Sequence, residues 1–183
     1  MEIKSIGLVE TNSVAKGVEC ADEMIKTADV ELLMARTTCP GRYMAMISGD
    51  VAAVQNSVDV SKEVAGEFLV DTFVIANVHA SVFPALSASG PIAELESLGI
   101  IETYTVASCI TAADAAAKSA DVALMEIRCA TGLAGKSFVT MTGDVGSVRA
   151  AVDAGVGEIE KEGLIQTYVV IPSPSRELYA SLV

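Results

Sequence analysis

The sequence predicts an α+β protein made of two tandem copies of one ferredoxin-like domain. The chain of 183 residues is long enough for two domains of roughly 90 residues each. Residues 7–36 align without gaps to residues 99–128, and within each copy the apolar spacing changes between that of a strand and that of a helix. We therefore expect a first domain over residues 1–90 and a second over residues 91–183.

The two copies share both residue identities and order. Thirteen of the thirty aligned positions are identical. The identical pairs include Glu10/Glu102, Thr11/Thr103, Asp22/Asp114, Lys26/Lys118 and Arg36/Arg128. The second copy then has two extra residues, after which Gly-Asp-Val at 49–51 matches Gly-Asp-Val at 143–145. The join is expected within Ser87–Ser97, where a Gly-Pro pair interrupts regular structure.

The first half of each copy is expected to run strand, helix, strand. Ile3–Thr11 has the composition of a strand. Residues 14–28 carry apolar side chains at helical spacing, with charged residues on the other face. Val30–Thr37 is a second apolar strand, and the turn Thr-Cys-Pro-Gly at 38–41 ends it.

The second half is expected to run strand, helix, strand. Tyr43–Ser48 is apolar, and Asp50 is a suitable N-cap for a helix over residues 51–65. Leu69–Asn77 is the last strand. The order strand-helix-strand-strand-helix-strand is that of the ferredoxin-like fold.

Composition favours self-assembly. Apolar residues make up 51% of the chain, whereas aromatic residues make up 4% and Trp is absent. Small apolar side chains suit thin, closely packed layers. Apolar surface beyond what a small domain can bury predicts large interfaces with other copies.

Charge and cysteine spacing exclude several classes. The formal charge of −12 opposes binding to nucleic acid or to an anionic membrane. The apolar run Phe68–Val78 is interrupted by Asp71 and Asn77, so no membrane span is expected. The beginning of the sequence shows no signal-peptide core, which predicts a cytoplasmic protein. Four cysteines without a Cys-x-x-Cys pair argue against a disulfide framework.

Several motifs together resemble the bacterial microcompartment shell-domain family, of the tandem type. They are GLVET and GIIET at 7–11 and 99–103, the helix ends at 21–30 and 113–122, and the two Gly-Asp-Val segments. The resemblance covers nearly the whole chain. It implies a structural protein and not an enzyme: a homotrimer, pseudo-hexameric in outline, in the shell of a microcompartment. The implied partners are other shell proteins at the tile edges and redox cargo enzymes.

The resemblance also assigns edge residues. Lys26 and Lys118 match the lysine that lies along the contact between neighbouring tiles. The alternative for each is a solvated helix lysine. His79 keeps the position of a histidine in the family's Pro-Arg-Pro-His motif, and a structural or interface role is expected for it in place of a catalytic one. The arginine of that motif is absent from both copies.

In the family, the turn between the second and third strands surrounds a central pore. The pore-lining residues implied here are Thr38, Cys39, Pro40 and Gly41 in the first copy, and Thr131, Gly132, Leu133, Ala134 and Gly135 in the second. The second turn lacks the spacing and the Ser/Thr of a phosphate-binding loop, and a strand follows it, so nucleotide binding is not expected.

Cys39 is the candidate metal ligand. In a trimer three Cys39 thiolates would converge on the axis. At roughly 5 Å they would repel by about 3 kcal/mol per pair at an effective dielectric constant of about 20. A metal removes this repulsion, and thiolates favour zinc or an iron–sulfur cluster. The resemblance implies a four-iron four-sulfur (4Fe-4S) cluster with three Cys39 ligands, a non-protein fourth ligand and a labile fourth iron. Arg42 is expected to offset its negative charge. Cys129, near the start of the second turn, is expected either to support the site from behind its ligands or to be a spare thiol, and Cys20 and Cys109 are expected to be buried.

Three alternatives stay open. The pore could pass metabolites without a metal, with Cys39 only lining it. An enzyme with Cys39 as nucleophile is opposed by the absence of an identifiable general base, since His79 follows a distant strand. A soluble ligand-binding regulator could use the same scaffold, because fold does not determine function.

Overall fold

The computed structural model describes residues 5–90 and 96–179. The chain divides into two compact units. One contains the residues up to Val78 together with Thr105–Ala107 and Ala130–Gly135, and the other contains the rest. The first unit therefore includes the beginning of one helix and one turn of the second repeat. Residues 91–95 of the expected join lie outside the described residues.

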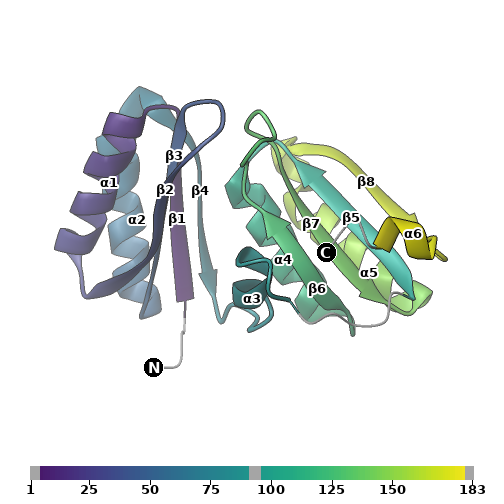
Figure 1. Cartoon of the computed structure of the whole chain (residues 1–183). Coiled ribbons are helices and arrows are strands. Elements are labelled where there is room, and N and C mark those ends of the chain that lie inside the picture. Colours follow the sequence, from purple (N-terminus) through teal and green to yellow (C-terminus); the bar gives the residue numbers. More distant parts are fainter. Residues whose placement is uncertain (1–4, 91–95, 180–183) are drawn as a thin grey trace. The chain divides into compact units, whose positions relative to one another are not determined.

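The first repeat is a four-stranded antiparallel sheet with two helices on one face (Figure 1). Its strands are ordered β2-β3-β1-β4. The elements are β1 (Ser5–Thr11), α1 (Val14–Thr27), β2 (Val30–Thr38), β3 (Arg42–Gly49), α2 (Val51–Ala65) and β4 (Leu69–Ala76). All of them were expected, and their bounds agree with the sequence prediction to within one residue wherever the residues are described.

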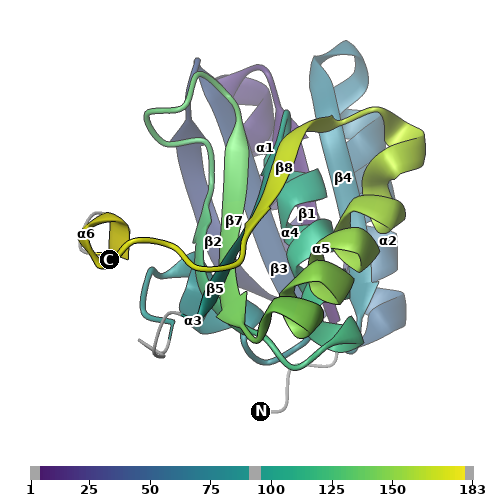
Figure 2. The ribbon, with the colours of Figure 1, turned by 90° about the vertical axis from the view of Figure 1, so that its right-hand side faces the viewer.

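The second repeat has the same topology, with strand order β6-β7-β5-β8. Its elements are β5 (Ser97–Thr103), α4 (Val106–Ser119), β6 (Ala123–Arg128), β7 (Ser137–Gly143), α5 (Val145–Ile159) and β8 (Ile165–Ile171). Figure 2 shows α4 and α5 side by side. Both repeats thus confirm the predicted ferredoxin-like order.

Short helices that the sequence did not predict follow the last strand of each repeat. They are α3 (Val82–Leu86) after β4 and α6 (Arg176–Tyr179) after β8. Each sheet also has a 3-10 turn before its last strand, at Gly66–Phe68 and Glu160–Glu162. Among the described residues, no helix is both long enough and apolar enough to cross a membrane.

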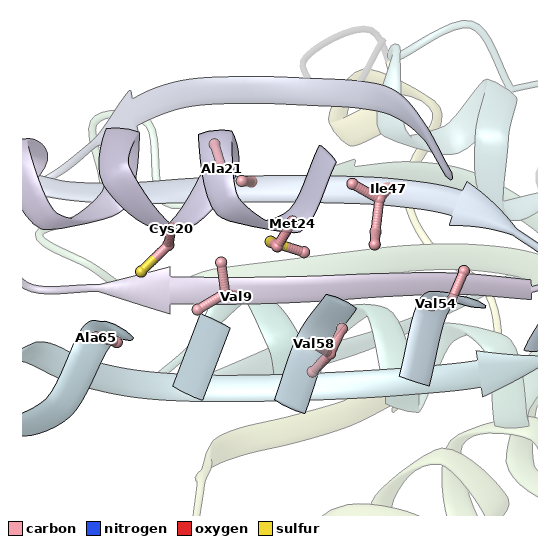
Figure 3. Close-up of a cluster of buried hydrophobic side chains, with 9 residues drawn as sticks. Val9, Cys20, Ala21, Met24, Ile47, Val54, Val58 and Ala65 are labelled. Carbon is pink, nitrogen blue, oxygen red and sulfur yellow. The ribbon is translucent and has the colours of Figure 1, made fainter. Parts of the chain in front are cut away.

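The core of the first repeat lies between the sheet and its two helices (Figure 3). The buried side chains there are Val9, Cys20, Ala21, Met24, Ala45, Ile47, Val54, Val58 and Ala65. A Cβ at Gly7 would lie 2.6 Å from side-chain atoms of both Val54 and Val58. Only glycine at this strand position lets α2 pack so close to β1, which explains why both repeats open with it.

The two Gly-Asp-Val segments start their helices differently. Asp144 caps α5 by accepting hydrogen bonds from the N–H groups of Gly146 and Ser147. Asp50 occupies the corresponding position before α2 but makes no side-chain cap hydrogen bond, so the expected cap is wrong in that detail. The Ser147 hydroxyl also donates to the Asp144 carboxylate and orients it, whereas alanine, at position 53, stands at the matching place in the first repeat.

Candidate functional site

The turn between β2 and β3 presents the candidate metal ligand. Cys39 is half-buried at its apex, and the following Pro40 is exposed. The turn closes by a hydrogen bond of 3.1 Å from the N–H of Gly41 to the carbonyl of Thr38. Gly41 has φ +93°, a conformation that side chains rarely adopt, so glycine is required there.

The turn Ala130–Gly135 lies beside the Cys39 turn within the first unit. The N–H of Cys39 donates to the Ala130 carbonyl at 3.3 Å, and Arg42 Nη1 donates to the Gly135 carbonyl at 3.4 Å. A Cβ at Gly135 would lie 3.2 Å from Cδ of Pro40, so the two turns pack closely only around a glycine. The structure thus brings together both turns that the family resemblance assigned to the pore.

Exposure differs between the residues of these two turns. Thr131, Gly132 and Ala134 are exposed, and Leu133 is half-buried. Thr38 is buried, and its Oγ1 has no hydrogen-bond partner in the described part of the chain. An unsatisfied buried hydroxyl next to a half-exposed thiol is unusual, because such groups are normally paired.

A single chain offers too few ligands for a metal at this turn. Within residues 5–90 and 96–179, no group of three or more His, Cys, Asp or Glu side chains could hold a metal ion. Thiolates are the ligands that iron–sulfur clusters and zinc prefer, and Cys39 is a free, half-buried cysteine. A cluster bound by Cys39 would therefore need the same thiol from other copies of the chain.

A buried carboxylate lies behind the Cys39 turn. Glu10, on β1, has no exposed side-chain area. Its Oε1 accepts a hydrogen bond of 2.9 Å from Arg42 Nη1, and its Oε2 accepts one of 2.9 Å from the N–H of Val106. Burial raises the pKa of Glu10, although the hydrogen bond from Val106 and the charge of Arg42 lower it. Desolvation therefore outweighs both partners.

The ion pair with Glu10 gives Arg42 a different role from the one expected. Arg42 was expected to offset negative charge at Cys39, but its guanidinium pairs with Glu10. The sequence contained a signal for the network, because Glu10 interrupts an apolar strand and is identical in both repeats. No pattern in the sequence indicated that Glu10 contacts Val106, which is 96 residues away along the chain.

The second repeat has a counterpart of this ion pair. Glu102 on β5 aligns with Glu10, and its Oε1 accepts from Lys136 Nζ at 2.6 Å. Lys136 follows the second turn as Arg42 follows the first. Both members are partly exposed, in contrast to Glu10.

The other three cysteines are buried, as the sequence predicted for Cys20 and Cys109. Cys129 is buried as well, which limits its use as a spare thiol. Burial, followed by the nearby Cys129, raises the pKa of Cys109 well above its ordinary value. Burial likewise raises the pKa of Cys20, so the thiols of Cys20 and Cys109 are protonated at neutral pH.

The three expected edge residues have different surroundings. Lys26 is exposed near the end of α1 and pairs with Asp22. Lys118 pairs with Asp114, a buried residue that also accepts a hydrogen bond of 2.7 Å from the N–H of His79. The His79 ring lies 2.7 Å from the Ser81 hydroxyl. Of the three, Lys26 has the most exposed side chain.

Comparison with known proteins identifies the family. The BMC domain matches the chain twice, over residues 5–78 and 97–174. The chain belongs to the BMC domain family. Over 98% of each sequence it is 40% identical to the bacterial microcompartment shell protein PduT of Citrobacter freundii. The BMC-domain chain is therefore a structural shell protein of a bacterial microcompartment, and the recognition from its motifs is confirmed.

Solved structures agree with this assignment. A microcompartment protein from Desulfitobacterium hafniense DCB is 51% identical, with a TM-score of 0.86 over 97% of this BMC-domain chain and 99% of that chain. A fused permuted hexameric shell protein of the RMM microcompartment is 19% identical, with a TM-score of 0.67 over 85% of this chain and 83% of that chain, and shares the fold. Because the relatives are shell proteins, the prediction that the chain is not an enzyme is confirmed.

Proposed function

We propose that the shell protein forms a homotrimer with the two repeats alternating around a threefold axis, and that three Cys39 thiolates at this axis hold an iron–sulfur cluster. The single observation that carries the cluster is the placement of one half-exposed cysteine at the turn that the family places around its pore. Such a cluster supplies electron transfer, so the trimer would pass electrons, or the cluster itself, across the shell.

The described residues support this site in two ways. The Cys39 turn is held by hydrogen bonds to the Ala130–Gly135 turn and by the Glu10–Arg42 pair, so the thiol is presented on a fixed backbone. The neighbouring Thr38 hydroxyl is buried and unpaired, and it is available to donate to a sulfur ligand. Hydrogen bonds to the sulfurs are one means by which proteins tune such clusters.

Two observations support assembly: exposed apolar side chains on α1 and the similarity of the fold to that of a hexameric shell protein. Val14, Val18 and Ile25 on α1 are exposed apolar side chains. Exposed apolar surface of this kind marks interaction sites. A fused shell protein of the same fold is hexameric, and three chains of two repeats each would supply six domains. We further propose that the trimer tiles with other shell proteins and meets redox cargo enzymes in the cytoplasm.

The proposed function is tested by anaerobic purification followed by light scattering, iron and sulfide analysis, and electron paramagnetic resonance. We expect three chains per particle and, at full occupancy, four iron atoms per trimer. A stable monomer at micromolar concentration contradicts the assembly. A trimer without iron after reconstitution contradicts the cluster and favours the metal-free metabolite pore.

Lys26 is predicted to support the contact between tiles. We expect Lys26→Ala to leave the trimer intact and to reduce sheet formation severalfold, because the long stem and the charge of this lysine are exposed on the surface. Electron microscopy of sheets grown at one fixed salt concentration measures the effect. Lys62→Ala is the matched control, since Lys62 is also exposed and paired with an aspartate one turn away on a helix. Equal sheet formation by both variants contradicts the edge assignment.

A further inference from the structure

We propose that the Glu102 carboxylate of one chain accepts a hydrogen bond from the backbone N–H of Val14, at the start of α1, in a second copy of the chain. The proposal rests on the homotrimer proposed above, because it assigns the polar contact through which the ring of repeats closes. It names the surface of each copy that is involved. One surface is the start of α1, and the other is the face of the β5–β8 strand pair that carries Glu102.

The same contact already exists once inside the first unit. Glu10 Oε2 accepts from the N–H of Val106 at 2.9 Å, and Asp71 Oδ2 accepts from the Thr105 hydroxyl at 2.6 Å. Val106 is the first residue of α4. The first N–H groups of a helix lack partners within the helix and carry partial positive charge, so a carboxylate there is stabilising.

The duplication assigns a counterpart to each member of this contact. Glu102 stands where Glu10 does, and Val14 stands where Val106 does. Glu10 of a first repeat binds the start of the first helix of a second repeat, α4. The equivalent partner of Glu102, in a second repeat, is therefore the start of the first helix of a first repeat, α1. In a ring of alternating repeats, the next first repeat belongs to another copy.

Each member of the second contact has one hydrogen-bonding group without a partner in the described part of the chain. Glu102 uses Oε1 for Lys136, whereas no partner is found there for its Oε2. Its side chain is 27% exposed, while that of Glu10 is fully buried. The N–H of Val14 makes no hydrogen bond within these residues, and Val14 is 39% exposed where Val106 is fully buried.

Exposed apolar side chains lie next to both free groups. Val18, one turn along α1 from Val14, is 51% exposed. Val169 on β8 is 44% exposed and lies on the same sheet face as Glu102, because Glu102 pairs with Thr167 and side chains alternate along a strand. Phe73, the counterpart of Val169 in the first repeat, is buried. Joining the two surfaces would remove apolar area from water around the polar contact.

A double-mutant cycle tests this contact. Glu102→Ala removes the acceptor. Val14→Pro removes the donor while keeping the helix, because proline is favoured at the first helical position. Ser13 already has the extended backbone, at φ −136° and ψ 124°, that a residue before proline prefers. The matched controls are Val14→Ala, which keeps the N–H, and Glu158→Ala, which removes an exposed carboxylate of α5.

Sedimentation over a range of concentrations gives the association constants, and circular dichroism checks that each variant is folded. We expect Glu102→Ala and Val14→Pro each to weaken one interface about tenfold, and so to weaken a trimer with three interfaces roughly a thousandfold. The double variant should be no weaker than either single variant, because both remove one hydrogen bond. The controls should assemble more tightly than either.

The possible outcomes separate this contact from the proposed function. A wild-type chain that stays monomeric overturns the homotrimer and this contact together. A wild-type trimer in which Glu102→Ala assembles as tightly as Glu158→Ala overturns only the contact. Fully additive effects in the double variant also overturn it, since they would show that Glu102 and Val14 act independently.

Discussion

Replacing Cys39 by alanine is expected to abolish iron binding while leaving the trimer intact. The thiol is the only protein ligand that each chain offers to the proposed cluster, so its loss removes all three ligands at once. Cys39 is half-buried on a surface turn and is absent from the hydrophobic core of its repeat, so the fold does not depend on it. Iron and sulfide content per trimer and the mass in solution measure the two parts of the prediction.

Substitutions at the remaining cysteines are the matched controls. Cys20→Ala, Cys109→Ala and Cys129→Ala should each keep the iron content of the wild type, because all three thiols are buried. Cys20→Ala and Cys109→Ala should lower stability by about 1 kcal/mol each through lost packing. Undiminished iron in Cys39→Ala, or loss of iron in a control that stays folded, would show that the ligand lies elsewhere.

Replacing Glu10 by alanine is expected to lower the free energy of unfolding by about 3 kcal/mol at neutral pH. The change leaves the largely buried Arg42 guanidinium and the N–H of Val106 without their carboxylate partner. Urea unfolding at one fixed protein concentration measures the loss. Glu102→Ala should lower the stability of the folded chain much less, because its pair with Lys136 is partly exposed.

The pH dependence of stability gives an independent check on Glu10. Burial raises its folded-state pKa above the ordinary value of 4.5, so the folded chain holds this proton more tightly than the unfolded chain does. Its contribution to stability therefore falls as the pH rises from 4.5 through the folded-state pKa. Relative to Glu10→Gln, the wild type should lose stability over this range. If the wild type instead gains stability relative to Glu10→Gln as the pH rises, the charge of Arg42 outweighs burial in setting the pKa of Glu10.

Most of the fold was predictable from local patterns. The helix over 14–28 was evident because apolar residues recur at its spacing, and the turn at 38–41 because Pro and Gly end a strand there. The duplication tested each element twice, since the same order had to fit both copies. The short helices α3 and α6 were missed, because five and four residues are too few to establish a helical period.

The candidate site was predictable only in part. Cys39 and the two glycine-containing turns could be named as candidates, because the family resemblance places these turns around a pore and the alignment of the repeats shows that only the first contains a cysteine. The Glu10–Arg42–Val106 network could not, since neither charge spacing nor periodicity relates residues 96 positions apart. The same limit applied to the charge of Arg42, which the sequence assigned to Cys39 and the structure pairs with Glu10.

The sequence by itself determined the repeat, the order of elements and the family, because identities between aligned segments and periodicity along the chain can be recognised without knowing which residues meet in space. The tertiary structure alone decided which polar groups are buried and which are left free. Glu10 and Glu102 are both glutamates in the same motif. Glu10 is buried and accepts a hydrogen bond from the first residue of α4, whereas Glu102 is partly exposed to solvent. The physical reason is that burial depends on what packs against a side chain, and that partner comes from a distant part of the chain or from another copy.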